Sequence, residues 1–241
     1  MARVFAKPEQ LQSERATLDE AAHRHLIKVL RLGAGATIQL FDGQGCEVEA
    51  RIEAVGKSSV DVSLGERRQL RPPACTVTLI QAVPRGERMD LIVQKTTEIG
   101  VARIVPVLSQ HSVSKPPPGR TRRWQTIAEE AARQSGRADV PMIEEPVARA
   151  AALASRGGRA DESRFLLWEG ERTESLHRGL AGGPAHVALL VGPEGGFAPT
   201  EVEACIQAGF RSVGLGPRIL RTETAAIVAV ALAQAAAGGL D

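Results

Sequence analysis

The sequence predicts an α/β protein, in which a small β domain precedes a larger domain with a mostly parallel sheet. In residues 37–64, polar and apolar side chains alternate with period two. Paired prolines stand at Pro72 and Pro73, and from Ala74 onward short apolar runs alternate with stretches of helical pattern. Such alternation favours a parallel sheet, because each helix returns the chain to the start of the next strand. We therefore expect domains at residues 1–70 and 74–241.

The first domain is expected to be mostly short strands. Period-two patterns predict strands over residues 37–41, 46–52 and 59–64, with residues 42–45 as a turn. A helix is expected over residues 19–30, with Asp19 as its N-cap. The charged, proline-ended stretch of residues 67–73 is predicted to be the linker between the domains.

In the second domain, strands and helices alternate to the end of the chain. Near-continuous apolar runs are typical of strands covered on both faces, and glycines mark the ends of several helical patterns. A helix over residues 222–237 is expected to be capped by Thr222. The predicted strands cover residues 76–83, 101–108, 165–168, 187–191 and 212–215, and the other predicted helices cover residues 89–99, 121–135 and 200–209.

The composition is that of a folded chain without membrane, secretion or metal signals. The 241 residues are 43% hydrophobic and 24% charged, and the longest apolar stretch, residues 225–233, is far shorter than the ~18 residues that cross a bilayer. The first residues lack the layout of a signal peptide. Cys46, Cys75 and Cys205 are far apart and lack metal-ligand spacing. We expect a cytoplasmic protein with no membrane partner and no metal.

Net charge says little about partners, since 30 basic and 28 acidic residues leave only +2. Three basic clusters are more informative, although any one of them could be a solvated face. Scarce aromatic residues, 3% of the chain, argue against binding single strands by base stacking, and Trp124 is expected in the core. The clusters are Lys115 with Arg120, Arg122 and Arg123; His23, Arg24, His25, Lys28 and Arg31; and Arg67, Arg68 and Arg71.

Two glycine-rich loops follow predicted strands, at the edge where open α/β sheets bind ligands. The first is Gly192-Pro193-Glu194-Gly195-Gly196, where glycine lets the backbone approach a ligand closely; a plain strand-to-helix turn is the alternative. It matches neither the phosphate loop nor the dinucleotide fingerprint. The second, residues 214–225, places Arg218 and Arg221 around an apolar pair, and both could instead be surface residues. Two such loops together favour a shared pocket.

The loop Gly-Pro-Glu-Gly-Gly and the segment Leu-Gly-Pro-Arg-Ile-Leu-Arg-Thr-Glu-Thr-Ala together resemble the SPOUT superfamily of RNA methyltransferases. They are most similar to the bacterial small-subunit ribosomal RNA uridine-N3 methyltransferase family. The similarity extends over nearly the whole chain, through residues 25–31, 42–43, 89–101, 123–124, 130–131, 134–137 and 140–141. Arg133 departs from the pattern, because the family usually carries an acid there.

The resemblance implies an N-terminal PUA-like β-barrel that binds RNA and a C-terminal α/β domain with a deep trefoil knot that holds S-adenosyl-L-methionine. It also implies a homodimer, in which the helix after Thr222 lies partly in the interface or simply in the core. The residues implied to bind the cofactor are Leu167, Trp168, Glu169, Val191, Gly192, Pro193, Gly195, Gly196, Leu215, Gly216, Ile219, Leu220, Thr222, Thr224 and Ala225.

The implied reaction is methylation of N3 of a uridine in 16S ribosomal RNA, within the small ribosomal subunit. We expect Arg221 to orient the uracil or a flanking phosphate, and Glu194 and Glu223 to orient arginines or accept the proton. The alternatives are a SPOUT methyltransferase for transfer RNA or a ribose 2′-hydroxyl, and a non-catalytic RNA-binding factor of ribosome assembly. The predicted RNA contacts are Arg3, His25, Arg31, Arg120, Arg122, Arg123 and Arg137.

Overall fold

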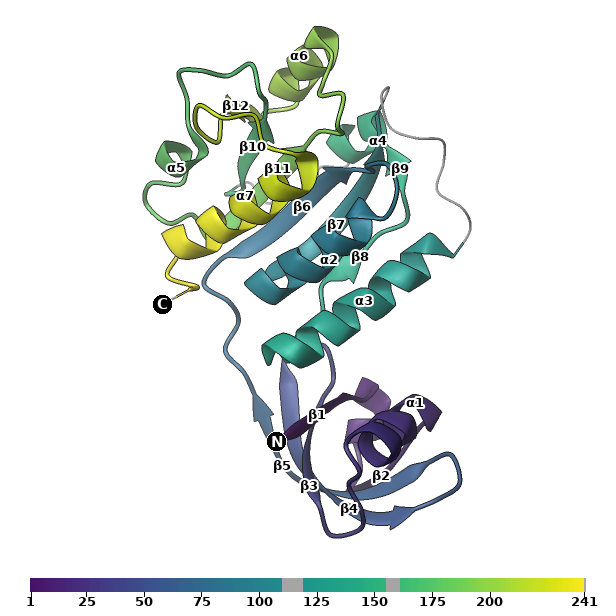
Figure 1. Ribbon diagram of the computed structural model, residues 1–241. Coiled ribbons are helices and arrows are strands. Elements are labelled where there is room, and N and C mark those ends of the chain that lie inside the picture. The colour runs from purple at the N-terminus through teal and green to yellow at the C-terminus, as the bar shows by residue number, and fades with distance from the viewer. Residues whose placement is uncertain (110–118, 155–160, 241) are drawn as a thin grey trace. The chain divides into compact units, whose positions relative to one another are not determined.

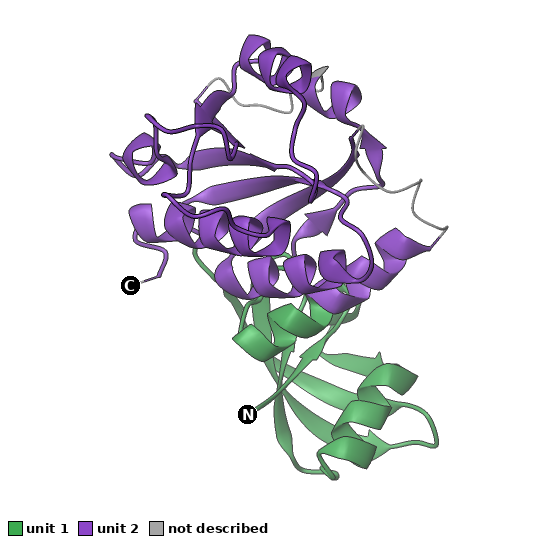
Figure 2. Cartoon of the chain, turned by 45° about the horizontal axis from the view of Figure 1, so that its top comes forward, with its two compact units in different colours: residues 1–72, 129–140 green, residues 73–128, 141–241 purple. Residues whose placement is uncertain are grey.

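The chain divides into two compact units, which Figure 2 shows in green and purple. The computed structural model describes residues 1–109, 119–154 and 161–240. Unit 1 comprises Met1–Pro72 and Glu129–Val140, and unit 2 comprises Pro73–Ala128 and Pro141–Asp241. Residues 129–140 therefore belong with the first unit, although the predicted division at residues 70–74 assigns them to the second. Where independently folding domains begin and end stays a prediction.

Unit 1 is built on a five-stranded sheet with the strand order β1-β3-β4-β5-β2 (Figure 1). Its pairings are antiparallel except for β1 with β3, which is parallel. Buried side chains such as Leu26, Ile38, Val48 and Ile52 form its core. The elements of this unit are β1 (Ala2–Phe5), a 3-10 turn (Pro8–Leu11), β2 (Arg15–Leu18), α1 (Glu20–His23), β3 (Thr37–Phe41), β4 (Cys46–Val55) and β5 (Val60–Gln69).

The predicted helix over residues 19–30 forms, but not as one regular α-helix. Asp19 is the predicted N-cap, and its carboxylate accepts a hydrogen bond of 3.0 Å from the Ala22 N–H. After His23 the chain widens into a π-helix over Arg24–Val29, which is rare in proteins and often found at functional sites.

The prediction of a linker from residue 67 is wrong, because β5 continues to Gln69. The reason is pairing with β4, which places Arg68 opposite Glu47 and Gln69 opposite Cys46. Opposite charges facing each other across a strand pair stabilise it, so a charged stretch can remain in the sheet.

Unit 2 contains the mostly parallel sheet that the sequence predicts. All its strand pairings are parallel, in the order β12-β10-β11-β6-β7-β8, with β9 paired to β7. The α/β fold class is thus confirmed, whereas the trefoil knot stays a prediction.

The strands are β6 (Thr76–Ala82), β7 (Val101–Leu108), β8 (Met142–Ile143), β9 (Val147–Ala148), β10 (Ser163–Leu167), β11 (His186–Val191) and β12 (Arg211–Val213). The helices are α2 (Arg88–Ile99), α3 (Arg120–Ser135, whose last turns belong to unit 1), α4 (Arg149–Ala154), α5 (Leu176–Gly179), α6 (Pro199–Gln207) and α7 (Thr222–Ala236).

Helices α2 and α7 lie side by side across one face of this sheet (Figure 1). The buried Gln234 near the end of α7 joins them, since its amide donates a hydrogen bond of 2.6 Å to the carbonyl of Gly100. Gly100 ends α2 in the left-handed conformation, at φ +110°, which a residue with a Cβ rarely adopts. The C-terminal helix is in this way fixed to the sheet that carries the candidate site.

Candidate active site

The carboxyl ends of β10, β11 and β12 lie at one edge of the sheet of unit 2. Leu167 at the end of β10 stands opposite Val191 of β11 on one side and Val213 of β12 on the other. The loops that leave these strands surround a cavity of about 550 Å3. This is the place where an open α/β sheet is expected to bind a ligand.

Nearly all residues predicted to bind the cofactor line this cavity, and so do Arg221, Glu194 and Glu223, the predicted catalytic residues. The exception is Thr224, which is exposed on α7. Ile219 lines the cavity although its side chain is 78% exposed. The cavity-lining members of the predicted set are Leu167, Trp168, Glu169, Val191, Gly192, Pro193, Gly195, Gly196, Leu215, Gly216, Ile219, Leu220, Thr222 and Ala225.

The structure adds residues to this wall that the sequence did not predict there. The most informative is Arg88, at the first position of α2. It follows β6, and β6 is the neighbour of β11 in the sheet, so Arg88 stands beside the glycine-rich loop. The place of Arg88 beside this loop depends on the strand order, which the sequence does not show. The other additions are Glu171, Arg172 and Val213. Gly214 and Arg218 also line the cavity, and both belong to the second loop that the sequence assigns to a shared pocket.

Buried hydrogen bonds hold the floor of the cavity together. The side-chain amide of Gln81, at the end of β6, donates to the Thr222 hydroxyl at 3.0 Å, and that hydroxyl donates to the carbonyl of Gly192 at 2.6 Å. Gln81 and Thr222 are both buried. The prediction that Thr222 caps α7 is wrong, because Arg221 occupies the N-cap position and the Thr222 hydroxyl is bonded to Gln81 of β6 and to Gly192 instead.

The glycine-rich loop needs glycine at its last position. Gly196 has φ +68°, in the left-handed region, and a Cβ there would collide with the carboxylate of Glu169. This glycine therefore lets the loop after β11 turn against the loop after β10.

The carboxylate of Glu171, in the cavity wall, accepts hydrogen bonds from residues of its own loop. Glu171 accepts hydrogen bonds from the hydroxyl and the N–H of Thr173, at 2.7 and 2.9 Å, and from the N–H of Glu174 at 3.1 Å. These bonds lower the pKa of Glu171 to about 2. Its role is to hold the loop after β10 in shape.

Arg88 joins the two predicted catalytic glutamates. Its guanidinium forms an ion pair with Glu194, and its Nε lies 4.0 Å from Oε2 of Glu223. The backbone N–H of Arg85 donates a second hydrogen bond to Glu194, at 2.9 Å. Burial by itself would raise the pKa of Glu194, but the backbone N–H groups of Glu194 and Arg85 and the Arg88 guanidinium together lower it.

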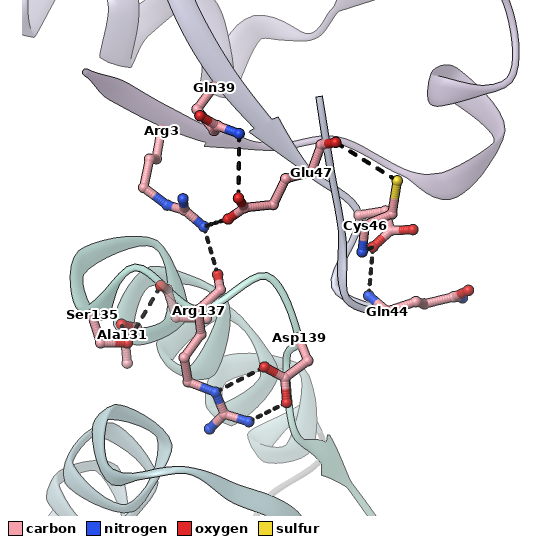
Figure 3. A network of polar contacts seen from close by, with 11 residues as sticks. Arg3, Gln39, Gln44, Cys46, Glu47, Ala131, Ser135, Arg137 and Asp139 are labelled. Atoms are coloured by element: carbon pink, nitrogen blue, oxygen red, sulfur yellow. Dashed lines mark hydrogen bonds and ion pairs between the residues drawn. The ribbon is translucent and has the colours of Figure 1, made fainter. Parts of the chain in front are cut away.

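In unit 1, the predicted RNA contacts Arg3 and Arg137 lie in a network of polar contacts, shown in Figure 3. Arg3 pairs with Glu47 at 2.6 Å and donates to the carbonyl of Arg137 at 3.0 Å. Arg137 pairs with Asp139 at 2.5 Å, and its side chain is only 12% exposed. The network fastens residues 129–140 to the β-sheet of the same unit.

The other predicted RNA contacts differ in exposure and in whether a carboxylate of the chain already pairs with them. Arg123 pairs with Asp90 at 2.5 Å, and Arg120 approaches the same carboxylate at 3.9 Å. Arg122 and Arg31 are exposed. Lys115, which the sequence groups with Arg120, Arg122 and Arg123, lies outside the described residues. Trp124 is buried as predicted, and its indole N–H donates to Asp90 at 3.0 Å.

His25 lies against Arg133, with 3.0 Å between its Nε2 and a guanidinium nitrogen. Its pKa is lowered by burial and by Arg133, while Glu130 acts in the opposite direction. Arg133, which departs from the family pattern, is therefore a neighbour of His25, a predicted RNA contact. Glu130 in turn pairs with Arg133 at 2.5 Å.

Within the described residues, no group of three or more His, Cys, Asp or Glu side chains could hold a metal ion. No described helix has both the length and the apolar character to span a membrane.

Comparison with known proteins defines the class. The family described as an RNA methyltransferase domain matches residues 71–234, and the RNA methyltransferase PUA domain matches residues 18–65. Among individual relatives, the ribosomal RNA small subunit methyltransferase E of Synechocystis sp. is 33% identical, over 95% of this chain and 76% of the relative. That of Bacillus subtilis is 31% identical over 95% of this chain and 94% of the relative. The chain belongs to the ribosomal RNA small subunit methyltransferase E family.

Solved structures agree with this assignment. The ribosomal RNA small subunit methyltransferase E of Neisseria gonorrhoeae, bound to S-adenosylmethionine, is 31% identical with a TM-score of 0.88, covering 98% of this chain and 97% of that one. A Legionella pneumophila protein, also solved with S-adenosylmethionine, has the same identity and coverage and a TM-score of 0.87. The α/β fold and the PUA-like N-terminal domain are confirmed.

Proposed function

We propose that the protein transfers the methyl group of S-adenosyl-L-methionine to N3 of a specific uridine in 16S ribosomal RNA. The observation that carries the proposal is the cavity at the ends of β10, β11 and β12, lined by the residues that the family resemblance singles out. Two similar structures contain S-adenosylmethionine, and the relatives are named as methyltransferases of small-subunit ribosomal RNA.

The cavity suits this cofactor in size and chemistry. Its volume of about 550 Å3 lies within the range of ordinary small-molecule sites. Leu167, Val191, Leu215 and Leu220 would supply apolar walls for the adenine, while backbone groups of Gly192–Gly196 and Leu215–Ala225 would hydrogen-bond the adenine and the ribose. When bound, the cofactor supplies an activated methyl group on a sulfonium.

The chain then has to position the uracil, because the methyl group is already activated. Arg221, exposed at the start of α7 and lining the cavity, would orient the uracil carbonyls or a flanking phosphate. A guanidinium fork suits either acceptor and stabilises negative charge that develops on the ring.

Unit 1, which contains the PUA domain, would bind the RNA, and so would the arginines of α3 that belong to unit 2. Direct phosphate contact is favoured for Arg31 and Arg122, which are exposed, over Arg3, Arg123 and Arg137, which are held by carboxylates of the chain. The arginines that are already paired would act by shaping the surface.

A homodimer working in the cytoplasm completes the proposal. The half-buried apolar residues Ile227, Val228, Ala231 and Leu232 on α7 support a dimer, since they would be covered by a second copy.

The test is tritium transfer from labelled S-adenosylmethionine to small ribosomal subunits that lack their own modification, followed by mass spectrometry of the labelled nucleoside. The expected product is 3-methyluridine. Transfer to transfer RNA or to a ribose hydroxyl would contradict the proposed substrate, and cofactor binding that is absent altogether would favour an assembly factor.

A further inference from the structure

We propose that Arg88 gives the two cavity glutamates different tasks: it holds Glu194 as a structural anion and leaves Glu223 as the carboxylate that accepts the proton from N3 of the uridine. Arg88 is then a positioning residue and Glu223 a catalytic one. The inference rests on the proposed function and deepens it.

Glu194 is unsuited to accept a proton. One of its carboxylate oxygens receives both the Arg88 guanidinium and the backbone N–H of Arg85. These bonds stabilise the carboxylate form and would be weakened by protonation. They also join the glycine-rich loop after β11 to the segment that starts α2, so Glu194 acts as a fastening between two walls of the cavity.

Glu223 has the opposite surroundings. Its side chain is only 12% exposed, and its Oε2 is buried without a hydrogen-bond partner. The nearest cation is Arg88, whose Nε is 4.0 Å away, too far for a hydrogen bond. Most buried polar atoms are paired, but this oxygen is not, and Glu223 belongs to the cavity wall. The carboxylate would therefore gain a partner if the side chain turned to meet a donor from a ligand. The N3–H of uracil is such a donor.

The step balances with these groups. The N3–H bond breaks and its proton forms an O–H bond with the Glu223 carboxylate. The electron pair left on N3 forms the new bond to the methyl carbon, while the pair of the breaking carbon–sulfur bond remains on sulfur, which leaves a neutral thioether. Glu223 afterwards returns the proton to water.

The first test compares Glu223→Gln with Glu194→Gln, using Glu203→Gln as the matched control because Glu203 is exposed on α6 and outside the cavity wall. We expect Glu223→Gln to lower kcat by roughly 100- to 10,000-fold, the usual range for a general base. Its affinity for S-adenosylhomocysteine, measured by calorimetry, should match that of the wild type. Turnover of Glu223→Gln should recover in alkaline solution, where N3 loses its proton unaided.

Glu194→Gln is expected to behave differently, with weakened S-adenosylhomocysteine binding and an unchanged acid limb in the pH profile of kcat. Glu223→Asp, which keeps a titrating group, should retain an acid limb at reduced kcat. The division of roles would be overturned by wild-type turnover in Glu223→Gln, by a loss of cofactor affinity that accounts for its defect, or by the base-like defect appearing in Glu194→Gln instead.

Arg88 is tested by separating its effect on turnover from its effect on cofactor affinity. Arg88→Met removes the ion pair with Glu194 and the cation nearest Glu223, so it should weaken S-adenosylhomocysteine binding as Glu194→Gln does and should lower kcat further. Arg88→Lys keeps the charge and should restore kcat in part. A kcat in Arg88→Met equal to that of Glu194→Gln would refute the action of Arg88 on Glu223.

Failure of the inference and failure of the proposed function give different results. A wild-type protein that transfers no methyl group to RNA overturns both. A wild-type protein that forms 3-methyluridine, together with an unimpaired Glu223→Gln, overturns only the assignment of the proton acceptor.

Discussion

Two clusters of arginine and carboxylate side chains, one in each unit, are buried to a similar degree but differ in how well they are paired. In unit 1, Glu47 is 14% exposed, receives Arg3 at 2.6 Å and accepts a hydrogen bond from Gln39 at 3.3 Å (Figure 3). In unit 2, Glu223 is 12% exposed, and its nearest cation is 4.0 Å away. Glu47 is satisfied by its own chain, whereas Oε2 of Glu223 has no hydrogen-bond partner.

The difference separates structural from functional charge more clearly than residue type or burial does. A buried acid with a full set of partners stabilises the fold, whereas one without partners remains costly until a ligand arrives. By this criterion Arg3 and Arg137 hold unit 1 together, whereas Glu223 is the acid that we propose to act on a ligand, next to Arg88 and Arg221 in the cavity wall. Variants of the two clusters should therefore affect different measurements.

Among the substitutions that test this comparison, those at Arg221 are expected to change turnover most. Arg221→Ala should lower kcat on the order of 100-fold or more, as when one preorganised donor is lost from an active site. Arg221→Lys should recover only part, because an ammonium cannot form the two parallel hydrogen bonds of a guanidinium. Arg221 is exposed, so the melting temperature should stay unchanged. Full turnover in Arg221→Lys at saturating RNA and cofactor would refute the orienting role.

Arg137 should show the reverse behaviour. Arg137→Ala removes the partner of Asp139 and the packing of a side chain that is only 12% exposed. We expect a loss of about 2 kcal/mol in the free energy of unfolding, measured in urea, with kcat of the remaining folded protein unchanged. Asp139→Asn is the control that keeps the arginine. If Arg137→Ala instead weakened RNA binding at full stability, the comparison of the two clusters would be broken.

Thr222 lies between these extremes, because its hydroxyl is both buried and part of the cavity floor. Thr222→Val keeps the shape and removes the bonds to Gln81 and Gly192, which should cost about 1 kcal/mol or somewhat more. That cost should appear as weaker S-adenosylhomocysteine binding and as a lower melting temperature together. Thr222→Ser, which keeps the hydroxyl, should restore both, and a change in only one of them would assign the network to a single role.

The sequence predicted the parts of the site that depend on position along the chain. Gly192–Gly196 and Leu215–Ala225 could be predicted because a strand pattern ends just before each loop, and ligand sites lie at strand ends. Arg88 could not, since its place beside Glu194 depends on β6 and β11 being neighbours, and the strand order leaves no local pattern. The pairing of Arg3 with the carbonyl of Arg137, 134 residues away, is hidden from the sequence for the same reason.

The smallest effect is expected in the salt dependence of RNA binding, where neighbouring arginines of α3 can be compared directly. Arg122 is exposed and pairs with no carboxylate within the described part of the chain, whereas Arg123 is held by Asp90 at 2.5 Å. If Arg122 contacts a phosphate, Arg122→Ala should reduce the slope of log affinity against log salt by about 0.7–0.9. Arg123→Ala should change the slope less, because that guanidinium is already neutralised. Equal changes in both slopes would show that RNA displaces Asp90, and pairing in the free protein would then no longer separate structural arginines from those that bind RNA.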